Sequence, residues 1–524
     1  MNLLNDPVFT VRTSDGPEKC SLPRIYRLLW TDQVEGFAKL QAHQKQAWHC
    51  FLAQLGAIAT EDREMPDSGD GWREALSALT CREAWNLYTE DLSKPAFMQP
   101  PVPEESIDPF RDSDGEIQEV DVTEYDIPVL SKNHALKLHR IQSPSSEHWV
   151  YLLVNVQTCE SGWGRGKYPT SRMNGGYGSR PFFTTTPSLR HGPWIMHDIE
   201  RMHNHAEKIE EEYGYRREVT PLLWTVSWDG EQSFDLSEMH PWYIDCCRRI
   251  RKVEVWMYAA TSGTRVQGVT KGQTGDPWAP INVIENKVLT PSENSFHYQQ
   301  LRSILFSGDF KRPVGFSDVD DGYIVCRALT PDDTAREYNL ERIIRFHNAA
   351  SDNPFETPDE SQIAEEARER VEKASTAASI FSHALDWLFC EDVEEGPSNG
   401  LMIAYKRQKR DEAAKAYDQQ ETALHSRIDQ RFFDRLFDAP DMDDDERYTF
   451  WETVLVDALR DQWEDAKRLC PAKDQWHRLA RAQSTLDGRI KSTFTYAKQV
   501  AEANEHPNAG NGMEESDARP VADL

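Results

Sequence analysis

The chain has 524 residues, and its 59 lysine and arginine residues face 88 aspartate and glutamate residues, so its formal net charge is −29. This length is too great for one ordinary hydrophobic core, and two or more domains are expected. The acidic balance excludes indiscriminate binding to polyanions, because such a field repels phosphates at long range. A local basic surface remains compatible with this charge, provided that neighbouring subunits neutralise most of the phosphates.

Cysteine usage and hydropathy indicate the compartment. The nine cysteines are scattered, with no CxxC motif and one adjacent pair, Cys246–Cys247, whose members can hardly bridge each other. No second pair lies nearby, so we expect no structural zinc. No signal-peptide pattern is present, and the longest apolar run, Trp149–Val154, is too short to span a membrane. We therefore expect a cytoplasmic protein with free thiols and no membrane association.

In the first third of the chain, the sequence predicts short strands and helices joined by turns. A short strand, a Ser-Asp-Gly turn and a helix capped by Ser21, with Pro23 in its first turn, come first. Residues 38–59 predict a helix with one apolar side, which carries Leu40, Trp48, Phe51, Leu52 and Leu55. Residues 101–128 are acidic and contain prolines, which is typical of an exposed connection. Residues 149–156 have helical apolar spacing and lead into the next segment.

The segment 162–181, GWGRGKYPTSRMNGGYGSRP, is the most informative stretch. It holds six glycines, no acid and four cations, Arg165, Lys167, Arg172 and Arg180. Across residues 131–190, eight cations face two acids, a local net charge of +6. Glycines let a backbone approach a ligand closely, and basic side chains donate to phosphates and base edges. The segment is therefore a candidate nucleic-acid contact, although a flexible surface loop has the same composition.

The rest of the chain changes character at Asn353–Pro358. Before this break, 218–330 contains strand-like pieces, PLLWTVSWDG, VEVWMYAATSG and GYIVCRAL, and predicts mixed helix and strand. After it, breakers separate four long amphipathic stretches, at about 360–390, 401–438, 442–469 and from Pro471 onward. Such helices with short connections predict an antiparallel four-helix bundle, whose apolar stripes form its core.

These elements predict an α+β fold. A large mixed α/β N-terminal globular domain over 1–358 would precede a C-terminal antiparallel four-helix bundle over 359–505. Residues 506–524, rich in Asn, Gly, Glu and Asp, are expected to form a disordered acidic tail.

The sequence contains no recognisable catalytic motif. Gly166-Lys167 resembles part of a phosphate-binding loop, but Tyr168 stands where Ser or Thr binds magnesium. The histidines His191, His197, His203 and His205 could gather into a metal cluster, although on a helix such residues are more often plain surface histidines. No nucleophile, base and orienting group combine. We expect a non-catalytic protein without a cofactor.

Several motifs together resemble one known family. They are the opening NLL-x-D-P-x-F-x-V-R, PAFMQP (95–100), the SKNH sequence (131–134), GWGRGKY followed by SRMNGGYGSRPF, and GDPWAP (275–280). With the closing bundle, their order resembles the CasA family, the large subunit of the type I-E CRISPR Cascade complex. The resemblance spans nearly the whole chain.

The resemblance implies a function and a set of partners. The family's large subunit is non-catalytic and lies beside the 5′ handle of the guide RNA (crRNA). It recognises the protospacer-adjacent motif (PAM) in double-stranded target DNA, separates the strands and promotes R-loop formation. It also presents a docking surface to the effector helicase-nuclease in antiviral defence. The implied partners include the backbone, 5′-handle-binding and small belt subunits of Cascade, with the belt subunits expected on the bundle.

The resemblance also implies site residues. The segment that meets the PAM and the RNA would be Ser131–Lys137, with Lys132, Asn133 and His134 in it and Asn133 as the base reader. The glycine-rich segment that enters the minor groove would centre on Gly162, Gly164, Arg165, Gly166 and Lys167. This fits a degenerate minor-groove readout, since small residues pass sugar edges easily.

Two further parts of the site follow from the same resemblance. The minor-groove lysine corresponds to Lys287, with Lys271 as the alternative. The strand-separating wedge would lie within Pro331–Arg336, before Leu340-Glu341-Arg342. The family's usual glutamine is missing there, so Thr334 and Arg336 are the candidates, and the segment could equally be a simple acidic turn.

Two other functions remain open at this point. The first is a metal-dependent nuclease that uses the His191–His205 cluster, and alanine replacement of those histidines would separate it from the binding subunit. The second is a purely structural scaffold, which bulky residues at Gly164 and Gly166 would test. The sequence does not reveal the PAM, the identity of the recruited nuclease or whether it acts in trans.

Overall fold

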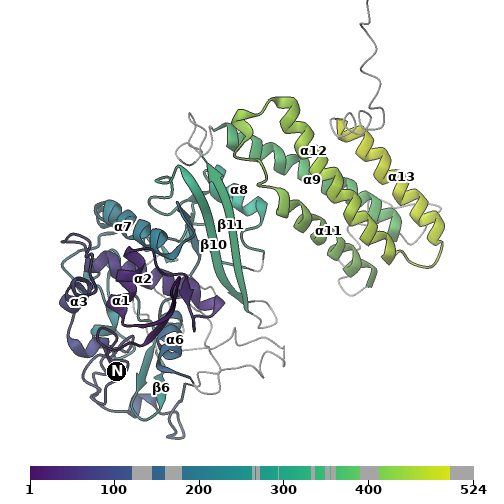
Figure 1. Cartoon of the computed structure of the whole chain (residues 1–524). Coiled ribbons are helices and arrows are strands. Elements are labelled where there is room, and N and C mark those ends of the chain that lie inside the picture. Colours follow the sequence, from purple (N-terminus) through teal and green to yellow (C-terminus); the bar gives the residue numbers. More distant parts are fainter. Residues whose placement is uncertain are drawn as a thin grey trace, which may run out of the picture. The chain divides into compact units, whose positions relative to one another are not determined.

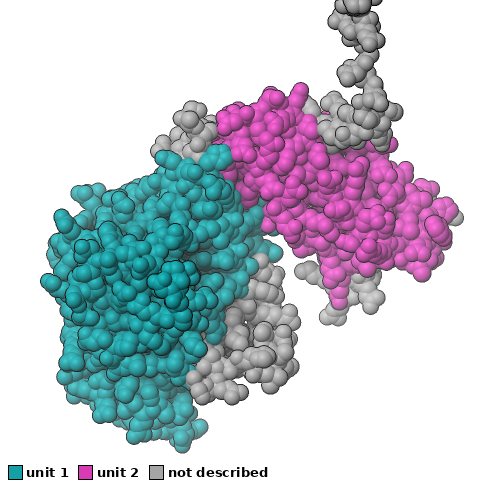
Figure 2. Space-filling view, in the orientation of Figure 1, with its two compact units in different colours: residues 1–359 teal, residues 360–524 magenta. Residues whose placement is uncertain are grey.

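The computed structural model describes residues 1–120, 144–159, 180–261, 266, 272–292, 294–331, 337–347, 355, 361–389 and 412–495. It divides into two compact units, unit 1 (Met1–Asp359) and unit 2 (Glu360–Leu524), which Figure 2 colours separately. Unit 1 mixes helices with small antiparallel sheets, and the described part of unit 2 is helical (Figure 1). The predicted α+β fold class is therefore confirmed.

Unit 1 begins with the predicted strand, turn and helix. Strand β1 (Phe9–Thr13) pairs antiparallel with β2 (Gly16–Cys20) and with β3 (Gly36–Phe37). Gly16 has a φ of 111°, which a residue with a side chain rarely adopts, so it allows the tight turn after Asp15. Helix α1 (Leu22–Trp30) follows Ser21 with Pro23 in its first turn, and the proline's missing N–H is not needed there.

Three helices form the centre of unit 1. They are α2 (Lys45–Ala59), α6 (Ser146–Thr158) and α7 (His191–Tyr213), and α2 packs against both others, while α3 (Gly69–Ala78) packs on α1 and α2. The predicted helix over 38–59 is too long, because α2 begins at Lys45. The expectation of one apolar side is also wrong, since α2 is buried along nearly its whole length and on all sides. A helix that is surrounded by other elements need not be amphipathic.

One of the three-stranded sheets of unit 1 contains the longest described strands of this unit. Strand β10 (Asp321–Pro331) pairs along its whole length with β11 (Glu337–His347), from Asp321 opposite His347 to Pro331 opposite Glu337. On its other side β10 pairs with β4 (Phe182–Thr186), but only over Tyr323–Arg327. The β10–β11 hairpin thus extends beyond β4 and is visible as a long ribbon in Figure 1.

The remaining elements of unit 1 are short. The strands and helix are β5 (Arg249–Lys252), β6 (Trp256–Ala259), β7 (Ile281–Asn282), β8 (Lys287–Val288), α8 (Tyr298–Phe306) and β9 (Phe310–Lys311). The 3₁₀ turns are Ala42–Gln44, Arg82–Trp85, Asp108–Phe110, Leu223–Thr225 and Leu236–Glu238. The strand expected in PLLWTVSWDG is wrong, because Leu223–Thr225 forms a 3₁₀ turn with Leu223 and Trp224 buried. A short apolar run satisfies either conformation when it is buried.

The described helices of unit 2 form the predicted antiparallel bundle. They are α9 (Gln362–Phe389), α11 (Glu412–Arg431), α12 (Asp444–Ala466) and α13 (Gln475–Thr493), and α9 packs against the other three (Figure 1). The prediction of a helix to residue 438 is wrong, because α11 ends at Arg431. Arg435 has a φ of 55°, which no α-helix accommodates.

A buried ion cluster joins three parts of the bundle. The Arg370 guanidinium donates to Glu366 Oε1 (2.7 Å) and to the carbonyl oxygens of Phe432 and Asp434 (2.8 Å each). Arg447 of α12 reaches the other oxygen of Glu366 at 3.3 Å. These charges are hydrogen-bonded on several sides, which offsets the desolvation that their burial costs.

The sequence expectations about membrane spans, cysteines and metal sites can be compared with the structure. In the described part of the chain, no helix has the length and hydropathy that crossing a membrane requires. The eight described cysteines are free thiols. Cys246 and Cys247 each donate to a carbonyl oxygen, of Met98 (3.6 Å) and Gln157 (3.1 Å) respectively, and burial raises the pKa of Cys247 to about 12. Among the residues described, no three His, Cys, Asp or Glu side chains converge on a metal position.

Candidate nucleic-acid interface

Helix α6 connects the two segments that resemble nucleic-acid contacts. Residues 121–143, with Lys132, Asn133 and His134, precede it, and residues 160–179, with Gly162, Gly164, Arg165, Gly166 and Lys167, follow it. Both segments lie outside the described residues. The helix between them has 13 residues, a length of about 20 Å, and is buried at most positions. The two segments therefore start from opposite ends of one fixed helix.

The glycine-rich segment is held at its neck, which consists of Cys159 and Arg180. The Arg180 amide donates to the Cys159 carbonyl oxygen at 3.1 Å, so the chain leaves and returns at one point. The Arg180 guanidinium donates to Asp276 Oδ2 at 2.8 Å and lies 5.1 Å from the centre of the Trp278 ring. Gln46 of α2 donates to the Arg180 carbonyl at 2.6 Å. The neck is thus bonded to the GDPWAP motif and to α2.

This geometry corrects the sequence interpretation of Arg180. The side chain is 1% exposed and belongs to the core, so it is not one of the cations available to a ligand. Arg190, counted in the same basic region, pairs with Asp32 at 2.9 Å. Acids from outside the region therefore balance two of its eight cations, and the local positive charge is smaller than the sequence suggests. The sequence signal that could have indicated this is the position of Arg180 two residues before β4, all five residues of which are buried.

Described residues on both sides of the range 121–143 contact Trp256 of β6. The Val120 amide donates to the Trp256 carbonyl oxygen at 2.8 Å. After the segment, Trp149 of α6 stacks on the Trp256 ring with 4.3 Å between ring centres. Glu147, also in α6, accepts from the Thr10 amide at 2.8 Å and ties the helix start to β1. Trp256 of β6 therefore contacts a described residue on each side of the range 121–143, within which the predicted PAM-contacting segment Ser131–Lys137 lies.

The predicted wedge is carried by the β10–β11 hairpin. Thr334 and Arg336 belong to residues 332–336, which join the two strands and lie outside the described residues. The strands below them are cross-linked, since Arg327 Nε donates to Glu341 Oε1 at 2.6 Å. Arg342 donates to the Phe296 carbonyl at 2.8 Å. A paired hairpin of this length presents the joining segment from a rigid support.

Lys287 occupies a different setting. It is the first residue of β8, after a turn in which Asn286 has a φ of 49°. Its Nζ lies 2.6 Å from Glu285 Oε2, and its side chain is 36% exposed. Ile284 in the same turn is 80% exposed. Lys287 is therefore accessible to a ligand that displaces Glu285, whereas the alternative, Lys271, lies outside the described residues.

The sequence suggested that the histidines of α7 are plain surface residues, and the structure shows that they are not. His203 Nε2 lies 2.9 Å from the Ala57 carbonyl oxygen and 3.3 Å from Thr60 Oγ1, so it joins α7 to the end of α2. His205 Nε2 lies 2.8 Å from Asp318 Oδ2. Burial lowers the pKa of His191 to about 4 and also lowers the pKa of His197. All four histidines are partly buried. His203 and His205 form tertiary hydrogen bonds.

A buried polar network was not anticipated from the sequence. His49 Nε2 lies 2.7 Å from Asp198 Oδ2, and Arg201 contacts the other oxygen of Asp198 at 2.9 Å. Trp278 Nε1 donates to Asp198 Oδ2 at 3.3 Å. Burial lowers the pKa of His49 despite its carboxylate partner. The only sequence signal is the i, i+3 spacing of Asp198 and Arg201 on the buried face of α7. The network braces the same Trp278 that packs on Arg180.

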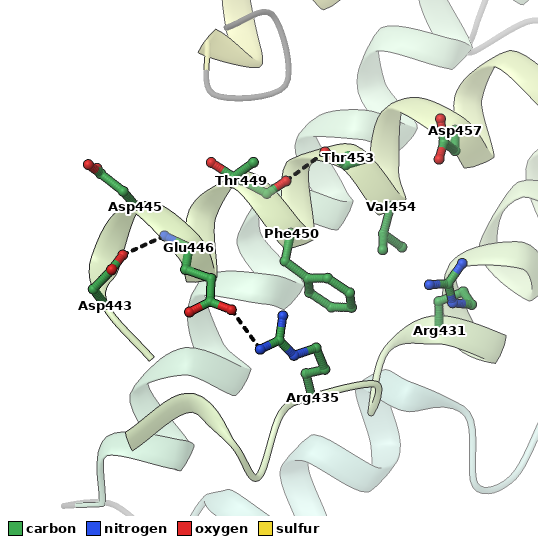
Figure 3. Close-up of a pocket in the computed structure, with 10 residues that line it drawn as sticks. All are labelled: Arg431, Arg435, Asp443, Asp445, Glu446, Thr449, Phe450, Thr453, Val454 and Asp457. Atoms are coloured by element: carbon green, nitrogen blue, oxygen red, sulfur yellow. Dashed lines mark hydrogen bonds and ion pairs between the residues drawn. The ribbon is translucent and has the colours of Figure 1, made fainter. Parts of the chain in front are cut away.

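Unit 2 has a groove of about 670 Å³ between the end of α11 and the start of α12. Phe450 points from α12 toward Arg435 (Figure 3), whose guanidinium lies 5.5 Å from the ring centre. Arg435 also pairs with Glu446 at 2.7 Å. Four acids and two arginines line the groove, so it is suited to a basic or mixed partner surface rather than to phosphate.

A mixed α+β unit followed by an antiparallel helical bundle is shared with solved structures. No family model matches the sequence, and no curated protein matches it. Thermus thermophilus CasA (Cse1) superposes with a TM-score of 0.61 at 14% identity, covering 94% of this chain and 99% of that one. Cse1 from Acidimicrobium ferrooxidans gives 0.60 at 12% identity, covering 94% and 98%, and Thermobifida fusca Cse1 gives 0.58 at 14%, covering 95% and 98%.

These similarities cover nearly the whole length of each chain. The chain therefore has the CasA (Cse1) fold, and the resemblance read from the sequence motifs is confirmed at the level of the fold.

Proposed function

We propose that this chain is the large, non-catalytic subunit of a type I-E crRNA-guided Cascade complex. In this function it recognises the PAM in double-stranded DNA, promotes strand separation and R-loop formation, and presents a docking surface for the effector helicase-nuclease. The observation that carries the proposal is that, in a CasA fold, tertiary contacts hold the described residues on both sides of three segments. These flanking contacts are those of Val120 and Trp149 with Trp256, the Cys159–Arg180 neck, and the paired ends of β10 and β11.

The anchoring supports recognition rather than scaffolding, because base readout needs loops held in register with a duplex. Phosphate contacts position a protein, and only groups fixed relative to those contacts can read base edges. The acidic charge of the whole chain supports a subunit of a larger assembly, in which other components neutralise most of the nucleic-acid charge.

The proposed partners are the crRNA 5′ handle, the target DNA and the other Cascade subunits. The bundle is the proposed contact for the small belt subunits. The groove of unit 2 supports this, since carboxylates that line it, such as those of Asp445 and Asp457, can pair with basic side chains of a neighbouring protein.

The test compares the crRNA-loaded complex with and without this chain on a randomised PAM library at physiological salt. Selective enrichment that requires the chain is the expected result. A complex that carries leucine at both Gly164 and Gly166 should assemble yet lose the enrichment, because bulky side chains keep the backbone away from the minor groove. Enrichment that is independent of the chain would reduce it to a scaffold.

A further inference from the structure

A cavity of about 300 Å³ in unit 1 gathers basic side chains from distant parts of the chain. Arg12 comes from β1, Lys45 is the first residue of α2, and Arg327 belongs to β10. Two acids, Glu35 and Glu341, also line it. Three cations thus face two acids in this cavity, although the whole chain has a net charge of −29.

Of the three basic residues that line the cavity, Arg327 is paired with an acid, and Arg12 and Lys45 are available to a ligand. Arg327 is bonded to Glu341 at 2.6 Å and lies 5.1 Å from the centre of the Trp194 ring, so its position is fixed. Arg12 and Lys45 are exposed, and neither forms an ion pair within the described part of the chain. Glu35 is the remaining acid. Arg12 and Lys45 can therefore meet an anion without first leaving a carboxylate.

The place of Arg12 depends on a glycine. Arg12 is the partner of Gly36 in the β1–β3 ladder. A Cβ at position 36 would lie 2.7 Å from Nη2 of Arg12, closer than any ordinary contact. The guanidinium thus rests in the space that the missing side chain leaves, beside the cavity. Alanine at position 36 would displace the guanidinium without removing its charge.

The rear of the cavity adds further positive character. His191 is the first residue of α7, a helix of 23 residues whose first turn has no side-chain cap. Burial and, after it, the nearby charges of His49, Arg327, Lys45 and Arg12 together lower the pKa of His191 to about 4, as expected where the potential is positive. The amino end of a helix contributes partial positive charge of the same sign.

We propose that this cavity binds a phosphate group of a single nucleic-acid strand. Arg12 offers the forked donors and Lys45 the point charge that phosphate oxygens accept. Arg327 is four residues before Pro331, so the cavity lies about 13 Å along β10 from the strand end that leads to the predicted wedge. Near the predicted wedge, a phosphate group would come from a separated nucleic-acid strand. This choice of ligand rests on the proposed function.

The test uses the isolated full-length chain and a fluorescent deoxythymidine decamer, with anisotropy as the readout. Lys45→Glu should weaken binding roughly tenfold, because a charge-assisted contact is replaced by repulsion. Lys208→Glu is the matched control: this exposed lysine lies 17 residues further along α7 than His191, about 25 Å away, and its replacement should leave the affinity unchanged.

Two conservative variants and the salt dependence separate a contact from a structural effect. Gly36→Ala should weaken binding, whereas Glu35→Gln should strengthen it. Lys45→Ala should lower the slope of log affinity against log salt by about 0.7, the value for one phosphate contact of a single strand. Equal affinities of the Lys45→Glu and Lys208→Glu variants would overturn the proposal.

Competition identifies the source of the phosphate. Unlabelled decamer should displace the probe at far lower concentration than thymidine monophosphate. Equal displacement would overturn the assignment to a strand and indicate a free nucleotide. Failure of the PAM-library assay together with Lys45-dependent decamer binding would contradict the proposed function and leave this site intact.

Discussion

Two ion pairs of unit 1 have the same chemistry and opposite settings. The Arg180–Asp276 pair is 1% exposed on both sides, and the Lys287–Glu285 pair is 36% and 52% exposed. Both basic residues belong to regions that the sequence connects with nucleic acid. In the first pair the charge is committed to the core, where it fixes the neck of the glycine-rich segment. In the second, water screens the charge and a ligand can compete for it.

The difference teaches that a basic residue in a conspicuous motif has either of two uses. A buried arginine positions the backbone from which accessible residues project, while an exposed lysine makes contacts itself. The following predictions test this division, from the largest expected effect to the smallest.

Replacing Arg180 should have the largest effect. Arg180→Met should destabilise unit 1 by about 3–5 kcal/mol, because Asp276 would remain buried without its partner. Thermal unfolding followed by circular dichroism measures this. The double variant Arg180→Met/Asp276→Asn should be more stable than the single one, since Asn still accepts from the Trp278 amide. A double variant that is less stable than Arg180→Met would contradict the assignment.

The same division applies to histidine and gives a pH dependence. His191 has a folded pKa of about 4 against a usual value of 6.5, so the folded state binds fewer protons than the unfolded state between these values. Stability is therefore fully present above pH 6.5 and falls as the pH drops toward 4, by up to about 3 kcal/mol. His191→Gln should flatten this part of the stability curve. His477→Gln, at an exposed position, should leave its shape unchanged.

Asn133 provides a test of base readout. Asn133→Ala should weaken PAM-dependent binding of the loaded complex by about 1–3 kcal/mol, the scale of a direct base contact. Binding to PAM-free DNA should stay the same, as electrophoretic mobility shifts with both duplexes can establish. Asn204→Ala, on an exposed face of α7, serves as the control. An equal loss on both duplexes would indicate a phosphate or structural role.

Lys287 tests the exposed ion pair of this comparison. Lys287→Ala should also weaken PAM-dependent binding by about 1–3 kcal/mol while changing the stability of the protein by less than about 1 kcal/mol. Glu285→Gln should strengthen binding modestly, since it frees the Lys287 ammonium from its carboxylate. Unchanged DNA binding in both variants would exclude Lys287 and leave Lys271 as the candidate. Competition against PAM-free duplex separates readout from charge.

The sequence alone determined the fold class and, to within about three residues, the bounds of α9 and α12, whereas it placed the end of α11 seven residues too late. The apolar period of α9, α12 and α13 is regular because each helix faces one core, so local pattern and tertiary environment agree. The motif order was enough to indicate the CasA fold, which similarity of structure confirms. For Asn133 and the glycine-rich segment, the motifs remain the sole basis of the predicted roles.

The tertiary structure alone decided which charges are available. Arg180, Asp276 and Gln46 come from three separate parts of the chain, and so do Arg12, Lys45 and Arg327, so no local pattern contains either set. Burial is a property of the neighbours that a residue acquires on folding, and desolvation then decides whether its charge is paired in the core or left for a ligand. The same reason explains α2: its sequence suggested one apolar face, but surrounding elements cover all of them.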